Sequence, residues 1–250
     1  MKKHIIILFT LILCLPGLIF PDVVSFKVGY FIPRAMSDLW DIEFENMSFT
    51  KTDYHNTNFA FSYEYFVSRE FSLVFGLDGY TKNKSGIYAD YVGEDIDSYG
   101  YAFDYGEGYS ISHVFSVSST PVQASIKFTP LGRKGTIIPF IGGGFGAYLW
   151  TVRVQGELID FDAGEEFIDV DLDAIVIGYP TYSVDAREEN KISFGFHVFG
   201  GVMLPVANRI SLEAEVKYNQ AKGNFKDGFI GFDPFDLGGW TISIGMNYWF

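Results

Sequence analysis

Six charged residues lie in segments that otherwise alternate between apolar and uncharged polar side chains. Because they include both lysines and glutamates, they can form ion pairs. In an extended chain, alternate residues point to opposite sides. Around residues 210–218 the side opposite the charges is wholly apolar or aromatic, so the charges share one face. Charged groups removed from water are tolerated only when they are paired. We predict a paired internal cluster, acting as scaffold or gate, of Lys27, Glu64, Lys127, Glu213, Glu215 and Lys217.

Two histidines, His113 and His197, lie in segments of the same kind. A hydrolytic site would need a histidine beside a nucleophile and an orienting carboxylate. Ser112 or Ser116 would supply the hydroxyl beside His113, but the surrounding residues match no hydrolase motif. We therefore expect an inward, hydrogen-bonded histidine, no enzymatic activity and no cofactor.

An acidic segment between Glu157 and Glu189 offers the best candidates for a metal site. Its alternating carboxylates at Asp169, Asp171 and Asp173 would lie on one side of an extended chain, where oxygen ligands suit Ca²⁺. The glycine and terminal glutamate of an EF-hand loop are missing, so a solvated acidic loop is the alternative. The net charge of −13 excludes a nucleic-acid partner, because phosphate binding needs a basic patch.

The elements that position these residues are strands. Only 20% of residues are charged, 18% are aromatic and 27 are glycine, a composition that favours β structure over helix. Eleven extended residues at about 3.4 Å each, tilted by about 40°, rise roughly 28 Å, which matches the apolar band of a membrane barrel. Period-two alternation predicts strands at 23–33, 58–66, 71–78, 122–128, 136–154, 192–204, 210–219 and 240–250.

The connections between these strands fall into two classes. Three are tight (67–70, 129–135 and 205–209), and four are long and rich in acidic residues (34–56, 81–110, 155–190 and 222–237). We therefore predict an all-β fold, an eight-stranded antiparallel transmembrane β-barrel with short periplasmic turns and long acidic outer loops. Within the third long connection, residues 167–176 alternate well enough to extend the wall as a hairpin beyond the membrane, and ten strands are the alternative if 167–185 pair fully. In the barrel the charged cluster points inward, because a lysine facing lipid costs about 2–4 kcal/mol.

The two ends of the chain carry their own patterns. Residues 1–21 have two lysines and then an apolar run, which predicts a signal peptide cut between about 17 and 22 and a barrel over 22–250. Leu13 before Cys14 does not fit a lipoprotein signal. The last strand ends the sequence on an aromatic residue, and its apolar face consists of Trp240, Ile242, Ile244, Met246, Tyr248 and Phe250.

This ending, together with Pro139–Gly146, Phe194–Val198 and Arg209–Ala214, resembles the OmpA/OmpW-type small outer-membrane barrels. The resemblance implies a place in a bacterial outer membrane, recognition of the final strand by the barrel-assembly machinery, and contact with outer-membrane lipid and lipopolysaccharide, with divalent cations at the outer loops. The resemblance indicates architecture rather than activity, and we expect a structural or surface-interacting role with a lumen filled by side chains. A narrow channel for small or hydrophobic molecules is the alternative, and an enzyme acting on lipid A is less favoured. A soluble lipocalin-like barrel is the alternative fold.

Overall fold

The computed structural model describes residues 23–104, 106–169 and 173–250. Within these ranges the chain forms twelve strands, one α-helix and one short 3₁₀ helix, so the fold is all-β. None of the described helices has the length and apolar character needed to cross a membrane. The predicted signal peptide over residues 1–21, including Cys14, lies outside the described residues.

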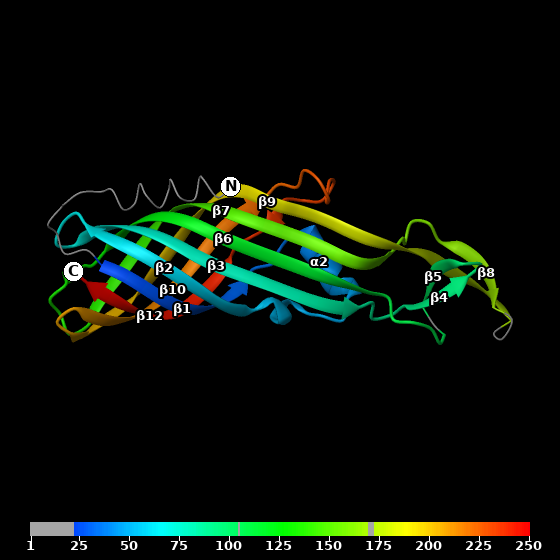
Figure 1. Ribbon diagram of the computed structural model, residues 1–250, viewed down its shortest axis with the longest axis horizontal. Helices are drawn as coiled ribbons and strands as arrows, with labels where there is room; N and C mark the ends of the chain where they lie inside the picture. The colour runs from blue at the N-terminus through cyan, green and yellow to red at the C-terminus, as the bar shows by residue number, and fades with distance from the viewer. Residues whose placement is uncertain (1–22, 105, 170–172) are drawn as a thin grey trace.

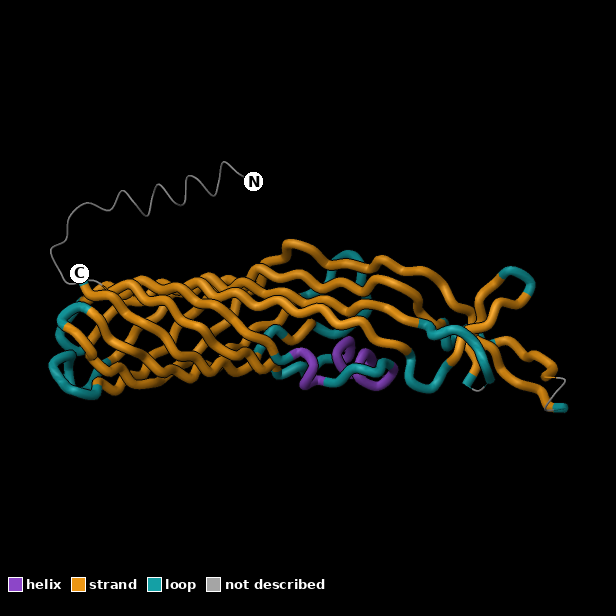
Figure 2. The backbone as a smooth tube through the Cα atoms, turned by 60° about the horizontal axis from the view of Figure 1, so that its bottom comes forward, coloured by secondary structure: helices purple, strands orange, loops and turns teal. Residues whose placement is uncertain are grey.

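Eight of the described strands pair in a closed antiparallel ring. Each pairs with two neighbours in the order β1-β2-β3-β6-β7-β9-β10-β12, and β12 pairs with β1 to complete the circle. Figure 1 shows the ring at the end where the chain terminates, and Figure 2 shows its tilted strands. The ring strands are β1 (Val23–Pro33), β2 (Asn56–Phe66), β3 (Phe71–Ile87), β6 (Ser112–Phe128), β7 (Ile138–Ile159), β9 (Ala174–Ala207), β10 (Ile210–Gly223) and β12 (Gly239–Trp249).

The wall of this ring is apolar outside and polar inside. Ile244 and Phe194 point outward and are 71% and 82% exposed, whereas Ser211 and Asn247 point inward and are fully buried. The same alternation runs along every ring strand, because successive side chains of a strand face opposite sides. An apolar exterior around a polar interior is the reverse of a water-soluble barrel.

Four ring strands continue well beyond the closed part, as the right half of Figure 1 shows. We call this continuation of β3, β6, β7 and β9 the outer extension. It begins at a β-bulge, where the register between β7 and β9 shifts between Trp150 and Val152 and Asn190 adopts a positive φ of 54°. The extra residue changes which residues of β9 face inward. In the closed ring these are the odd-numbered residues, such as His197, whereas in the outer extension they are even-numbered residues, such as Glu188.

The long connections contain more regular structure than the sequence predicted. Residues 34–56 were predicted to be irregular but hold α2 (Asp38–Asn46) and the 3₁₀ helix η1 (Lys51–Tyr54). The hairpin predicted over 167–176 is confirmed by the pairing of residues 167–169 with 174–176. Much of the rest of 81–110 and 155–190 was predicted as loop, yet it prolongs β3, β7 and β9, and the two connections together add three short strands. These are β4 (Val92–Ile96), β5 (Tyr99–Phe103) and β8 (Glu165–Asp169), and β11 (Phe235–Asp236) lies in the last long connection.

An aromatic core fills the inner side of the outer extension. Trp40 of α2 stacks on Phe235 with ring centroids 5.1 Å apart, and it meets Phe115 of β6 edge-on at 5.1 Å and Tyr54 at 4.9 Å. The indole N–H of Trp40 donates to the backbone carbonyl of Asp236 at 3.2 Å. Helix α2 and the segment before β12 therefore cover the four strands where the ring is no longer closed.

Glycines on the inner face of the ring make room for aromatic side chains on the neighbouring strand. Gly142 pairs with Phe199, and Gly201 pairs with Phe140. A Cβ at Gly142 would lie 2.3 Å from the Phe199 ring and 2.6 Å from the Ile126 carbonyl oxygen. Such distances are too short for non-bonded atoms, so the filling of the ring by Phe199 requires glycine at this position.

We predict that Gly142→Ala destabilises the barrel by about 1–3 kcal/mol, because a side chain forced into a filled interior displaces its neighbours. Gly76→Ala is the matched control, since a Cβ there would meet no atom closer than 3.9 Å. Urea unfolding of both variants, followed by electrophoretic mobility, compares them. Equal midpoints for Gly142→Ala and the wild type would contradict this account of the packing.

Candidate functional site: the charged cluster of the lumen

The structure brings the six predicted charged residues together inside the ring. Lys27 lies between two carboxylates of β10, with its Nζ 2.6 Å from Glu213 Oε1 and 2.6 Å from Glu215 Oε2. The Nζ of Lys127 lies 3.0 Å from Glu64 Oε2 and 3.5 Å from Glu213 Oε2. Glu213 therefore links the lysines of β1 and β6 across the lumen.

Lys217, the sixth predicted residue, pairs mainly with Asp78, which was not predicted as a member of the cluster. Its Nζ lies 3.0 Å from Asp78 Oδ2, donates to Gln123 Oε1 at 3.1 Å, and is 3.9 Å from Glu215 Oε1. Asp78 lies on the inward face of β3, at the end of the predicted strand 71–78. Alternation along the sequence predicted that Asp78 faces inward. The relative shift of the strands around the ring, which brings Asp78 to Lys217, could not be predicted from the sequence.

Neutral side chains complete the cluster. Ser72 Oγ donates to Glu64 Oε1 at 2.5 Å, and Asn247 Nδ2 donates to Glu213 Oε2 at 3.0 Å. The Lys127 ammonium also lies 4.1 Å from the centre of the Phe140 ring. We call the three lysines and the four carboxylates with these neighbours the lumen cluster. Its charged members are Lys27, Lys127, Lys217, Glu64, Asp78, Glu213 and Glu215.

The lumen cluster is almost free of bulk water. The side chains of Lys127 and Glu213 are 5% and 1% exposed, and the cavity among the cluster residues measures about 30 Å³. That volume holds about two water molecules. Above it a cavity of about 20 Å³ lies beside Tyr148, whose hydroxyl donates to Asn219 Oδ1 at 3.2 Å. Asp78 contributes to the lining of both cavities, and each cavity has room for only about one or two water molecules.

The two wall histidines occupy separate environments. Nε2 of His197 lies 2.7 Å from the hydroxyl of Ser125 inside the ring. His113 lies in the outer extension, where its Nε2 is 2.8 Å from Glu43 Oε2. Ser112 and Ser116 occupy the opposite face of β6 from His113. The structure therefore pairs His113 with a carboxylate and directs the two candidate hydroxyls away from it.

The candidate metal ligands lie at the far end of the molecule. Asp169 ends β8, Asp173 precedes β9, and Asp171 lies outside the described residues. Within residues 23–104, 106–169 and 173–250, no three His, Cys, Asp or Glu side chains are grouped closely enough to hold a metal ion. Divalent-cation binding at this segment stays a prediction.

The predicted assembly residues lie on the outer wall. Trp240, Ile242, Ile244, Met246, Tyr248 and Phe250 are all exposed along the outward face of β12 and the residue after it. Trp249 instead turns inward, and its indole N–H donates to Ser211 Oγ at 3.0 Å. Recognition of this strand by an assembly machinery stays a prediction.

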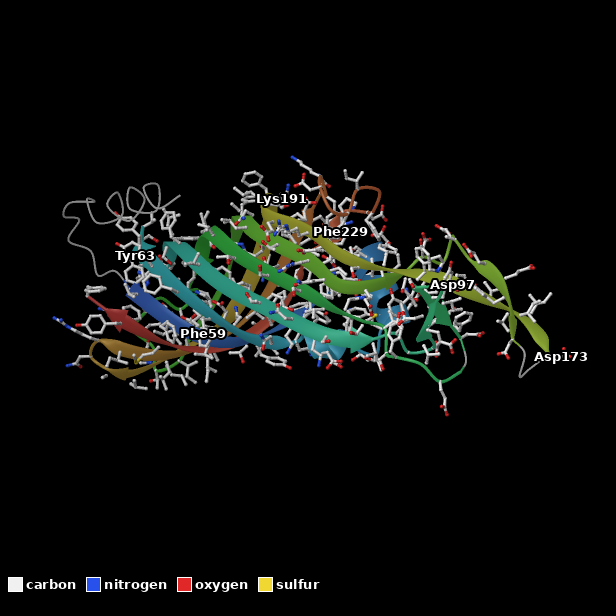
Figure 3. All side chains as sticks on the ribbon, turned by 45° about the vertical axis from the view of Figure 1, so that its right-hand side comes forward. Phe59, Tyr63, Asp97, Asp173, Lys191 and Phe229 are labelled. Atoms are coloured by element: carbon white, nitrogen blue, oxygen red, sulfur yellow. The ribbon has the colours of Figure 1, made fainter. Side chains whose placement is uncertain are left out.

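Glu188, a buried carboxylate outside the lumen cluster, fixes the loop after β10 at the start of the outer extension. Glu188 accepts hydrogen bonds from the backbone N–H groups of Lys226 and Asp227 at 3.0 and 2.9 Å, and its carboxylate lies 2.9 Å from Lys191 Nζ. Burial alone raises the pKa of Glu188, but the hydrogen bonds from Lys191 and from the two N–H groups outweigh burial and lower it. In Figure 3, Lys191 lies beside the loop that carries Phe229.

We predict that Lys127→Ala destabilises the barrel by about 3–5 kcal/mol, because Glu64 and Glu213 then lose a buried cation. Lys134→Ala is the matched control, since Lys134 is exposed in the turn between β6 and β7. Urea unfolding followed by electrophoretic mobility measures both variants. A Lys127→Ala protein as stable as the control would show that the lumen cluster adds nothing to stability.

Comparison with known proteins gives matches among solved structures alone. No family model matches the sequence, and no curated protein matches it. The outer-membrane protein OprG from Pseudomonas aeruginosa has 10% identity and a TM-score of 0.46, with 92% of this chain and 95% of that chain covered.

Two further structures are similar at the same level. Neisserial surface protein A has 13% identity and a TM-score of 0.44, with 92% and 97% of the two chains covered. The N-terminal β-barrel domain of OprF from Pseudomonas aeruginosa has 9% identity and a TM-score of 0.42, also with 92% and 97% covered. In this chain itself, the closed antiparallel ring satisfies the backbone hydrogen bonds of the wall, its exterior is apolar and its interior is polar. The chain is a small closed β-barrel with the apolar exterior and polar interior of a transmembrane β-barrel.

Proposed function

We propose that the chain is a non-conducting, non-enzymatic barrel that holds a rigid interaction structure above the outer membrane. The observation that carries the proposal is the filled lumen, in which three lysines and four carboxylates interlock and leave cavities of about 30 and 20 Å³. Moving water or an ion through this ring would require the paired charges to separate, at a cost of several kcal/mol for each ion.

The proposed orientation follows from the connections. The tight turns at 67–70, 129–137 and 208–209 lie at the end of the barrel where both Val23 and Phe250 lie, and they would face the periplasm. The outer extension would then stand in the aqueous space outside the cell. Outer-membrane barrels have short periplasmic turns and longer extracellular connections, which supports this orientation.

The far end of the outer extension supports a role in surface interaction. Ile168 of β8 and Ile175 of β9 form a cross-strand pair, and both side chains are exposed to solvent. Acidic residues flank them, and Asp97 and Asp173 mark this end in Figure 3. Exposed apolar groups rimmed by charge are typical of interaction sites. We infer a partner surface with apolar and basic groups, and outer-membrane lipid, lipopolysaccharide and divalent cations at these loops stay proposals.

A channel for small or hydrophobic molecules is the second candidate. One observation favours it: a hollow of about 580 Å³ on the outer wall lies beside Gly146 and Gly195, and Gln123 borders both this hollow and the lumen cluster. Conductance and lateral passage are separable by experiment.

We predict that the purified protein shows little steady conductance in planar lipid bilayers, because paired side chains fill its lumen. Lys127→Ala should add brief openings, whereas the turn variant Lys134→Ala should behave like the wild type. A large, stable conductance of the unmodified protein would overturn the proposal in favour of a diffusion channel. Uptake of an apolar dye into proteoliposomes without conductance would favour passage through the wall.

We also predict the orientation. The single cysteine of the sequence, Cys14, lies within the predicted signal peptide, so an introduced cysteine would be the only one in the processed chain. On intact cells, a membrane-impermeant maleimide should label Asp173→Cys and leave Lys134→Cys unlabelled. After cell lysis both should react. Labelling of Lys134→Cys alone on intact cells would reverse the proposed orientation.

A further inference from the structure

A cleft of about 330 Å³ opens in the outer extension, between helix α2, the strands β7 and β9, and the loop before β11. The helix contributes Leu39, Ile42, Glu43 and Asn46, which share one face because they are three or four residues apart. Trp40 projects from the adjoining side of α2 and packs into the aromatic core. Helix α2 therefore separates a filled core from an open cleft.

The walls of the cleft are apolar and incompletely covered. Val184 and Ala186 of β9 form one side, and Phe229 reaches over from the loop labelled in Figure 3. Ile42 and Tyr182 line the cleft and remain 43% and 49% exposed, although they lie outside the proposed membrane band. Apolar side chains that stay exposed within a concave site of this volume are typical of a small-molecule binding pocket.

The cleft has one charged feature. Glu43 and His113 line it, and their side chains are 5% and 1% exposed and joined at 2.8 Å. No lysine or arginine lines the cleft among the described residues. The carboxylate of Glu43 can accept further hydrogen bonds beyond the one from His113. A ligand with a positively charged donor would therefore meet a complementary group, and a ligand carboxylate would be repelled.

We propose that this cleft binds a small amphipathic amine, with the apolar body between α2 and β9 and the ammonium group at Glu43. The volume is too small for a protein helix, whose diameter with side chains is about 10–12 Å. The aromatic lining favours the same ligand class, because aromatic rings attract cations and the centre of the Tyr88 ring lies 5.8 Å from that of His113, the partner of Glu43. This binding activity goes beyond the proposed surface role and does not depend on a closed lumen.

The test uses the full barrel in lipid nanodiscs and three probes that share one apolar body: 4-phenylbutylamine, 4-phenylbutanol and 4-phenylbutyrate. Equilibrium dialysis against empty nanodiscs corrects for partition into lipid. The amine should bind tightest, and the carboxylate should bind at least about tenfold more weakly, because only the amine forms a charge-assisted hydrogen bond. Equal binding of all three probes would overturn the proposal.

Two variants locate the binding. Ala186→Trp fills the cleft and should abolish amine binding, whereas Ala214→Trp places the same side chain on the outward face of β10 and should leave it unchanged. Glu43→Gln should remove the preference for the amine over the alcohol without abolishing alcohol binding. Amine binding that survives Ala186→Trp would place the probe elsewhere and disprove the site, even if Glu43→Gln proves too unstable to measure.

Discussion

The width of the lumen is the constraint on which the structure depends. Eight strands enclose an interior only wide enough for side chains or one small ligand. Inward side chains must therefore pair and pack with one another. The chain meets this requirement twice, by sharing three lysines among four carboxylates and by setting aromatic rings such as Phe199 against glycines such as Gly142. Ion pairing and the packing of aromatic side chains against glycines both fill the narrow lumen.

The outer extension faces the opposite problem, because four strands without a closing partner leave their inner face open. Helix α2 solves it with two different faces. Its Trp40 side completes an aromatic core with β6 and β11, and its Glu43 side leaves a cleft. The covering segments are held by buried polar anchors. Arg34 forms two hydrogen bonds to Asp236, and Glu188 fixes the loop after β10.

The sequence was sufficient to predict strands wherever one face meets an apolar environment, since period-two alternation is strong there. It also placed six charges on the inward face, and the structure sets all six in the lumen. The role of Asp78 could not be predicted in the same way. Its partner Lys217 lies on β10, and the stagger of a closed ring, which decides which residues meet across it, leaves no local pattern. Helix α2 was missed because much of its apolar surface faces a core built from distant segments.

The upper part of β9 was predicted only in part. Its far end was expected as one arm of the hairpin over 167–176, where β8 pairs with the start of β9. Residues 177–191 were predicted as loop because the connection around them is rich in acidic residues and because the bulge at Asn190 reverses which residues face inward. The continuity of β9 has a mechanical consequence. Residues 174–191 of this strand cover about 60 Å at roughly 3.3 Å per residue. They are joined to the ring by an unbroken run of backbone, so a pull at the tip would be transmitted along covalent bonds and β-ladder pairs to the closed ring.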